Sequence, residues 1–163
     1  AELMAKGLLC SKEVAKEKLR KIVYDGLKKY FKRIKCYDNV PETFEKFKNA
    51  GFKLALLSDF PPEQKGEIWG VKKYCDVVLG TEQLGALKPD AYSFLEMAKM
   101  LNVEPSKILY VGNSKKYDVA GSHNAGMKCA YLVPFRKRLF KKFIKEPEIC
   151  FSNYRQLQDI VLQ

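Results

Sequence analysis

Five polar side chains in three stretches of the sequence could together handle a phosphate group and a metal ion. Ser58 and Asp59 lie in LLSDF, Lys88 lies in GALKPDAYSF, and Asn113 and Asp118 lie in ILYVGNSKKYDVAGSHNAGM. A hydroxyl, nearby backbone N–H groups and an ammonium can hold the oxygens of a phosphate. A carboxylate and an amide oxygen suit Mg²⁺, a hard ion that prefers oxygen ligands. Such a set would position and neutralise a transferring phosphoryl group.

The elements that must position these side chains are short apolar runs, each ending where polar residues begin. The runs are FKLALLS, CDVVLG, SKILYVG, KCAYLV and EICF. Helical patterns separate them, including residues 89–102, 117–126, 135–145 and 153–162. Short apolar strands alternating with helices predict an α/β fold: a three-layer, Rossmann-like parallel sheet with helices on both faces. Because such sheets bind ligands beyond the carboxyl ends of their strands, we expect the polar residues to meet there.

A separate helical segment precedes this pattern. Apolar residues recur at three- and four-residue spacing between positions 12 and 35, at Leu19, Ile22, Val23, Leu27, Tyr30, Phe31 and Ile34. This spacing predicts one long helix with a buried stripe, and lysines and arginines cover its other face. We therefore divide the chain into a helical segment, residues 1–35, and a core, residues 36–163.

Composition narrows the class of protein. The chain has 163 residues, of which 47% are hydrophobic and 30% charged, as is typical of a soluble globular domain. A net charge of +11 is compatible with anionic substrates, but no basic stretch carries base-stacking aromatics in the arrangement of a nucleic-acid platform. No apolar run reaches the roughly 20 residues of a membrane span. The five cysteines form no Cys-x-x-Cys pair, so we expect reduced thiols in a cytoplasmic protein.

The three stretches resemble motifs two, three and four of the haloacid dehalogenase-like hydrolases, in matching order and spacing over about residues 36–133. The helical segment before residue 36 is similar to the last part of that family's helical cap. The resemblance implies that Ser58 binds the phosphoryl oxygens and that Lys88 stabilises the phosphate and the charge of the nucleophile. It also implies that Asn113 and Asp118 hold Mg²⁺ directly or through water. Family members mostly hydrolyse phosphomonoesters through an aspartyl-phosphate.

Three departures from the family pattern bear on this interpretation. Asp59 stands where Asn is common. We place it with Ser58 and Lys88 among the phosphate-binding residues, although its carboxylate would repel substrate unless it turns away or is neutralised. Asn113 stands where a first Asp is common, which removes one negative charge from the metal site. The sequence contains no Asp-x-Asp, the family's motif one; the nearest imitation, Asp25 in KIVYDGL, is predicted to lie on the charged face of the helix.

The missing motif leads to a structural expectation. In the family, the motif-one strand lies in the middle of the sheet, so its neighbours here would leave unpaired backbone groups in the core, each costing roughly 1–3 kcal/mol. We expect that the segment with the nucleophile lies outside this sequence. A gap in the sheet would also favour association with another chain.

The leading hypothesis is a Mg²⁺-dependent phosphatase of a small phosphorylated metabolite, acting through an aspartyl-phosphate. Ser58 and Lys88 would be its catalytic residues within this chain, and the chain by itself would be inactive. The alternative is a non-catalytic binding module that keeps the hydrolase scaffold, which Asp59, Asn113 and the missing motif favour. A dehalogenase is a third option, although the metal-site residues would then have less to do.

Overall fold

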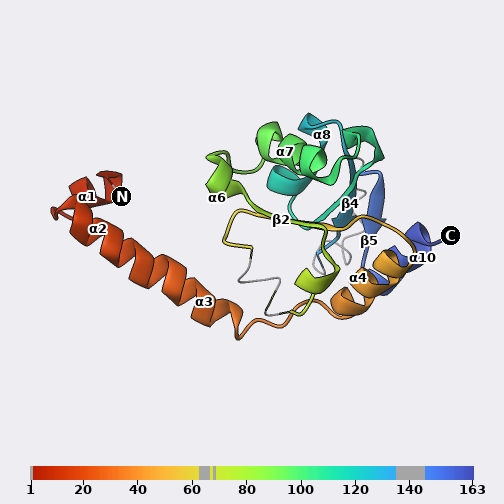
Figure 1. Cartoon of the computed structure of the whole chain (residues 1–163), viewed down its shortest axis with the longest axis horizontal. Coiled ribbons are helices and arrows are strands. Elements are labelled where there is room, and N and C mark those ends of the chain that lie inside the picture. The colour runs from red at the N-terminus through yellow and green to blue at the C-terminus, as the bar shows by residue number, and fades with distance from the viewer. Residues whose placement is uncertain (1, 63–66, 68, 135–145) are drawn as a thin grey trace. The chain divides into compact units, whose positions relative to one another are not determined.

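A computed structural model describes residues 2–62, 67, 69–134 and 146–163. The chain forms two compact units, Ala1–Lys35 and Cys36–Gln163, coloured red to orange and orange to blue in Figure 1. Within the described residues, no helix is long and apolar enough to cross a membrane.

The first unit is helical. Its elements are α1 (Glu2–Gly7), α2 (Lys12–Leu19), the π-helical turn η1 (Arg20–Asp25) and α3 (Gly26–Phe31). The predicted long helix is thus confirmed from residue 12 to residue 31, and Asp25 is exposed as expected.

The predicted continuous apolar stripe of this helix is wrong at two positions. Phe31 is buried, but Ile22 and Tyr30 are 65% and 58% exposed. Ile22 lies within the π-helical turn and Tyr30 follows it, where the wider turn departs from the regular helical period that the prediction assumed.

The second unit alternates helices and strands. Its helices are α4 (Val40–Asn49), α6 (Thr81–Leu84), α7 (Ala91–Leu101), α8 (Ala120–Asn124) and α10 (Tyr154–Val161), with shorter 3₁₀ or π turns η2 (Lys72–Tyr74), η3 (Pro105–Lys107) and η4 (Lys115–Val119). Its strands are β1 (Ala55–Ser58), β2 (Val77–Gly80), β3 (Leu109–Gly112), β4 (Lys128–Leu132) and β5 (Ile149–Phe151). Each predicted strand is present. The basic helix predicted at 135–145 lies outside the described residues.

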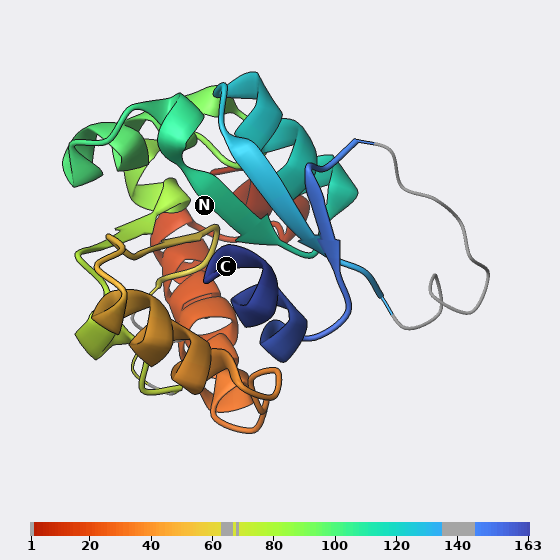
Figure 2. The ribbon, with the colours of Figure 1, turned by 90° about the vertical axis from the view of Figure 1, so that its right-hand side faces the viewer.

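The strands are all parallel, as predicted, but they form two sheets. β1 pairs with β2, and β4 lies between β3 and β5 (Figure 2). Among the described residues, β1 and β3 each pair on one side only, and not with each other. The sheet is therefore interrupted between β1 and β3, as expected.

Helices cover both faces of the three-stranded sheet, and the side chains of β4 alternate between them. Ala130 and Leu132 pack in one cluster with Leu157 of α10, while Cys129 and Tyr131 pack on the other side with Val119 of η4. This alternation follows from the two-residue period of a strand. The result is the three-layer arrangement expected from the sequence.

Helix α7 joins the two sheets. Phe94, which is fully buried, lies in one cluster with Leu57 of β1 and Tyr110 of β3. Gly121 of α8 allows this packing, because a Cβ at that position would lie 2.5 Å from the Phe94 ring. Side-chain packing, instead of strand pairing, therefore holds β1 and β3 in the same unit.

Candidate active site

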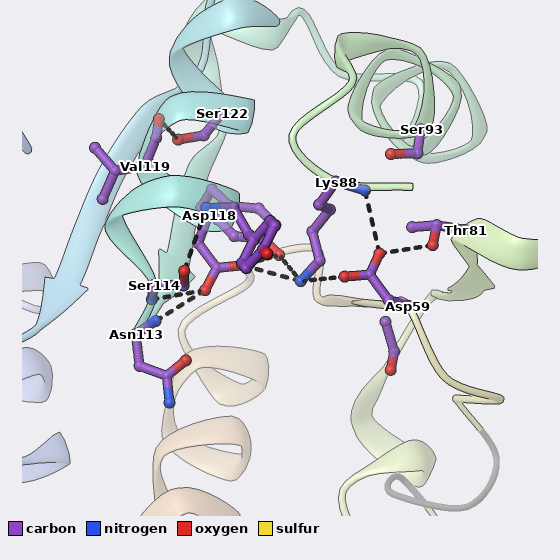
Figure 3. A network of polar contacts seen from close by, with 12 residues as sticks. Asp59, Thr81, Lys88, Ser93, Asn113, Ser114, Asp118, Val119 and Ser122 are labelled. Atoms are coloured by element: carbon purple, nitrogen blue, oxygen red, sulfur yellow. Dashed lines mark hydrogen bonds and ion pairs between the residues drawn. The ribbon is translucent and has the colours of Figure 1, made fainter. Parts of the chain in front are cut away.

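Loops from both sheets converge on the ammonium of Lys88. The carboxyl ends of the paired strands lie at one edge, with Ser58 opposite Gly80 in the first sheet. Lys88, in the loop between α6 and α7, places its Nζ 2.9 Å from Asp118 Oδ1 and 3.8 Å from Asp59 Oδ2 (Figure 3). The Lys88 and Asp118 side chains are only 12% and 7% exposed. Three stretches far apart in sequence thus share one partly buried polar centre.

Asp118 is held by four hydrogen bonds. Its Oδ1 accepts from Lys88 Nζ at 2.9 Å and from the Tyr110 hydroxyl at 3.3 Å. Its Oδ2 accepts from the backbone N–H groups of Asn113 and Ser114, both at 3.0 Å. Because a carboxylate has about four acceptor positions, this one is fully engaged.

Local backbone features bring Asp118 back to the end of β3. The turn η4 is π-helical, and its N-cap Ser114 accepts a hydrogen bond from the backbone N–H of Tyr117. Gly112 must lack a side chain, because a Cβ there would lie 2.7 Å from Asp118 Oδ2. The Gly112-to-Asp118 spacing in the sequence is therefore a geometric requirement of the site.

Tyr110 belongs to this centre, although we did not predict it. Its hydroxyl contacts Lys88 Nζ and Asp118 Oδ1, each at 3.3 Å. Burial first, and then the neighbouring Asp118 carboxylate, raise the pKa of Tyr110 well above its usual value, so the phenol stays protonated and can donate. The signal in the sequence was a tyrosine inside an apolar strand, since a buried hydroxyl must find a partner.

Asp59 points toward donors of the protein and toward the Lys88 ammonium. Its Oδ1 accepts hydrogen bonds from the Thr81 hydroxyl at 2.7 Å and from the backbone N–H of Lys88 at 3.2 Å. With its Oδ2 near the Lys88 ammonium, the carboxylate links the ends of β1 and β2 to the lysine loop. The charge of Asp59 is only partly offset, because the same ammonium also pairs with Asp118. A direct contact between Asp59 and phosphate stays a prediction.

Ser58 ends β1 and is 6% exposed. Its hydroxyl oxygen accepts a hydrogen bond from the backbone N–H of Phe60 at 3.2 Å, which is the turn-capping arrangement of serine. A hydroxyl has a second lone pair and a proton, so this bond leaves a donor for a phosphate oxygen. Its predicted role as a phosphate ligand is compatible with this position.

Asn113 and Asp118 offer oxygen atoms of the type that Mg²⁺ prefers, and so fit this ion in chemistry. The Asn113 side-chain amide donates to the Tyr37 hydroxyl at 3.3 Å, which leaves its carbonyl oxygen for other contacts. Asp118 is already saturated by four donors, so a metal-bound water would have to share them. No group of three or more acidic, histidine or cysteine side chains suited to a metal occurs among the residues that the structure describes. These two residues would therefore supply only part of a Mg²⁺ coordination shell.

Comparison with known proteins assigns the family. The haloacid dehalogenase-like hydrolase family matches residues 4–132, which include all five predicted site residues. The chain belongs to this family. A haloacid dehalogenase-like phosphatase from Thermococcus onnurineus has a similar structure, with a TM-score of 0.73 and 24% identity over 97% of this chain and 84% of that one.

Curated relatives of this family member are phosphatases by name. It is 30% identical over 126 residues to a phosphoglycolate phosphatase from Aquifex aeolicus, covering 72% of this chain and 59% of that protein. It is 32% identical over 100 residues to a glyceraldehyde 3-phosphate phosphatase from Methanopyrus kandleri, covering 60% of this chain and 43% of that protein. The chain therefore spans only about half the length of these two relatives.

Proposed function

We propose that this haloacid dehalogenase-like protein is part of a Mg²⁺-dependent phosphatase that acts on a small phosphorylated metabolite. The observation that carries the proposal is the convergence of three loops on Lys88, whose Nζ lies between the carboxylates of Asp59 and Asp118. A buried, oriented ammonium at the carboxyl edge of a parallel sheet suits a phosphate group.

In the proposed site, this chain binds and orients the phosphate. The Ser58 hydroxyl would donate to one phosphoryl oxygen and the Lys88 ammonium to another, which neutralises charge as the phosphoryl group transfers. Tyr110 and Asp118 would keep Lys88 in place. Bound Mg²⁺, held by the Asn113 carbonyl oxygen and through water by Asp118, would supply further positive charge at the phosphate.

The proposed reaction needs a nucleophile that this sequence does not contain. We propose that an Asp-x-Asp segment enters as a strand between β1 and β3, where each strand has an unpaired edge among the described residues. Its first carboxylate would then lie at the same edge of the sheet as Lys88 and form the aspartyl-phosphate. The chain by itself is accordingly expected to bind phosphate weakly and to hydrolyse nothing.

The names of the relatives support a small, anionic phosphate ester as the substrate class. Phosphoglycolate and glyceraldehyde 3-phosphate are the substrates in those names. Both are short molecules with one phosphate group.

The test is to join an Asp-x-Asp segment from a related phosphatase upstream of residue 1 and to measure phosphate release with Mg²⁺. An aryl phosphate and 2-phosphoglycolate would serve as substrates. Activity should appear in the joined protein, vanish when the first Asp of the added segment becomes Asn, and fall at least about a hundredfold in Lys88→Met. A joined protein that folds but releases no phosphate would refute the proposed function.

The second candidate is a non-catalytic phosphate-binding module. The full engagement of Asp118 and the neutral Asn113 at the metal position favour it. In that case the joined protein would bind inorganic phosphate at the Lys88 site without turnover.

A further inference from the structure

The three N–H donors of the Lys88 ammonium are not equally engaged. The Nζ atom lies 2.9 Å from Asp118 Oδ1 and 3.3 Å from the Tyr110 hydroxyl oxygen, whereas Asp59 Oδ2 is 3.8 Å away. The last distance is too long for a hydrogen bond but short enough for an ion pair. Among these contacts, the donor facing Asp59 is therefore the easiest for a phosphate oxygen to take, and Asp59 is its direct competitor.

The negative charge of Asp59 is fixed beside Lys88. Thr81, which is fully buried, donates its hydroxyl to Asp59 Oδ1 at 2.7 Å, and the backbone N–H of Lys88 donates to the same oxygen at 3.2 Å. Figure 3 shows the carboxylate pointing toward both residues. The carboxylate cannot turn away from the ammonium without breaking these bonds.

The charges of this network do not favour an anion. Lys88 contributes +1 and the carboxylates Asp59 and Asp118 contribute −1 each, so the three described groups sum to −1. A phosphate group would meet net repulsion there. Adding a divalent cation changes the sum to +1, whereas an asparagine at position 59 would bring it to zero without any cation.

We propose that Asp59 is a counter-charge that makes phosphate binding at Lys88 depend on a divalent cation. This inference rests on the proposed function and adds a positioning residue that couples phosphate binding to cation binding. The coupling arises because the cation offsets the net negative charge of the network, so each ligand favours the other. Asparagine at this position would keep the hydrogen bonds, and phosphate binding would depend less on the cation.

The experiment measures inorganic phosphate affinity of the 163-residue chain by calorimetry, with and without Mg²⁺, in Asp59→Asn and the wild type. The substitution keeps an oxygen for Thr81 and for the Lys88 N–H. Without Mg²⁺, Asp59→Asn should bind phosphate about three- to tenfold more tightly than the wild type, because one like charge is gone. The gain from adding Mg²⁺ should be smaller in Asp59→Asn than in the wild type.

Thr81→Val is the matched control, because it removes one hydrogen bond to Asp59 without changing any charge, and the Lys88 N–H still holds the carboxylate. It should give a clearly smaller gain in phosphate affinity than Asp59→Asn, and equal gains in both variants would overturn the inference. Should Asp59→Asn fold poorly by circular dichroism, Asp59→Ser, which also removes the charge, should give a gain of the same sign.

Two failures can be told apart. If the wild type binds phosphate with Mg²⁺, Lys88→Met does not, and Asp59→Asn equals the wild type, the inference is wrong and the proposed site stands. If no variant binds phosphate under either condition, the inference is wrong, and the proposed function is then decided by the joined protein. Tighter cation-free binding in Asp59→Asn supports the inference even where the wild type binds too weakly to measure.

Discussion

The two sheets of the second unit differ in how deeply they are buried. In the three-stranded sheet, four consecutive residues of the central strand β4, from Cys129 to Leu132, are buried, and so is Phe151 of β5, whereas the edge strand β3 has no buried residue. In the two-stranded sheet, burial is confined to the carboxyl ends, at Ser58, Leu79 and Gly80. Yet both sheets supply residues to the same site. The site is thus built by joining a well-packed half to a less packed one, and its geometry depends on what joins them.

The largest expected effect follows from removing the apolar link between the halves. Phe94→Ala deletes a fully buried ring that packs with residues of β1 and β3 at once. We expect a loss of about 3–5 kcal/mol in the free energy of unfolding, measured by urea denaturation. Met100→Ala, at a 55% exposed position of the same helix, is the control and should change stability by less than about 0.5 kcal/mol. Similar losses in both variants would show that Phe94 is not a specific link.

A somewhat smaller effect is expected from breaking the polar link. Lys88→Met leaves Asp118, which is 5% exposed, without its cation and should lower the free energy of unfolding by about 2–4 kcal/mol. Adding Asp118→Asn to Lys88→Met should recover part of the loss, because the uncompensated charge is removed. If the double variant is less stable than the wild type by the sum of the two single-variant losses, the two residues are not coupled.

Much of this comparison could be predicted from the sequence. Short apolar runs ending in polar residues located the strands, and the parallel arrangement brought Lys88 and Asp118 together as expected. The orientation of Asp59 and the part played by Tyr110 could not be predicted, because each depends on a partner that only the folded chain supplies. Thr81 was visible as a residue at a strand end, but nothing in the sequence paired it with Asp59. The π-helical turns also escaped prediction, since apolar spacing assumes a regular helix.

Amide hydrogen exchange should sharpen the comparison without any substitution. β4 pairs on both sides, whereas β1 and β3 pair on one side only among the described residues. Amides of β4 should exchange at least about tenfold more slowly than those of β1, which corresponds to about 1.4 kcal/mol. In the protein joined to an Asp-x-Asp segment, protection should rise in β1 and β3 and change little in β4. Equal protection of β1 and β4 in the chain alone would show that the edge of β1 is covered.

The smallest expected effects concern two carboxylates that accept backbone N–H groups near the amino ends of strands. In the three-stranded half, Glu148 Oε2 accepts from the Cys129 N–H at 2.7 Å and contacts His123 Nε2 at 3.2 Å. In the two-stranded half, Asp76 accepts from the Leu54 N–H at 2.8 Å and pairs with Lys48 at 2.6 Å. The two groups hold equivalent places, because each directly precedes one strand, β5 or β2, and accepts a hydrogen bond near the start of the neighbouring strand, β4 or β1.

Both carboxylates should make stability fall in acid. Burial raises the pKa of Glu148, but the Cys129 N–H and His123 lower it by more, so its net shift is downward. Lys48 and then the Leu54 N–H lower the pKa of Asp76. A carboxyl with a lowered folded-state pKa stabilises the fold above its unfolded pKa of about 4, and that contribution is lost as pH falls through the folded value. Glu148→Gln should lower stability at pH 7 by less than about 1 kcal/mol, because the pair is exposed and screened.

The measurement is the melting temperature of the wild type, Glu148→Gln and Asp76→Asn between pH 7 and pH 3. Between pH 7 and pH 3, the melting temperature of each variant should fall less than that of the wild type. The three melting temperatures should converge at the acid end. High salt should shrink the Asp76→Asn difference more, since Lys48 is the first cause of its shift and an exposed ion pair is screened. Should Glu148→Gln respond to salt more strongly than Asp76→Asn, the backbone N–H would not be its main stabilising contact, and the two halves would differ in the opposite way.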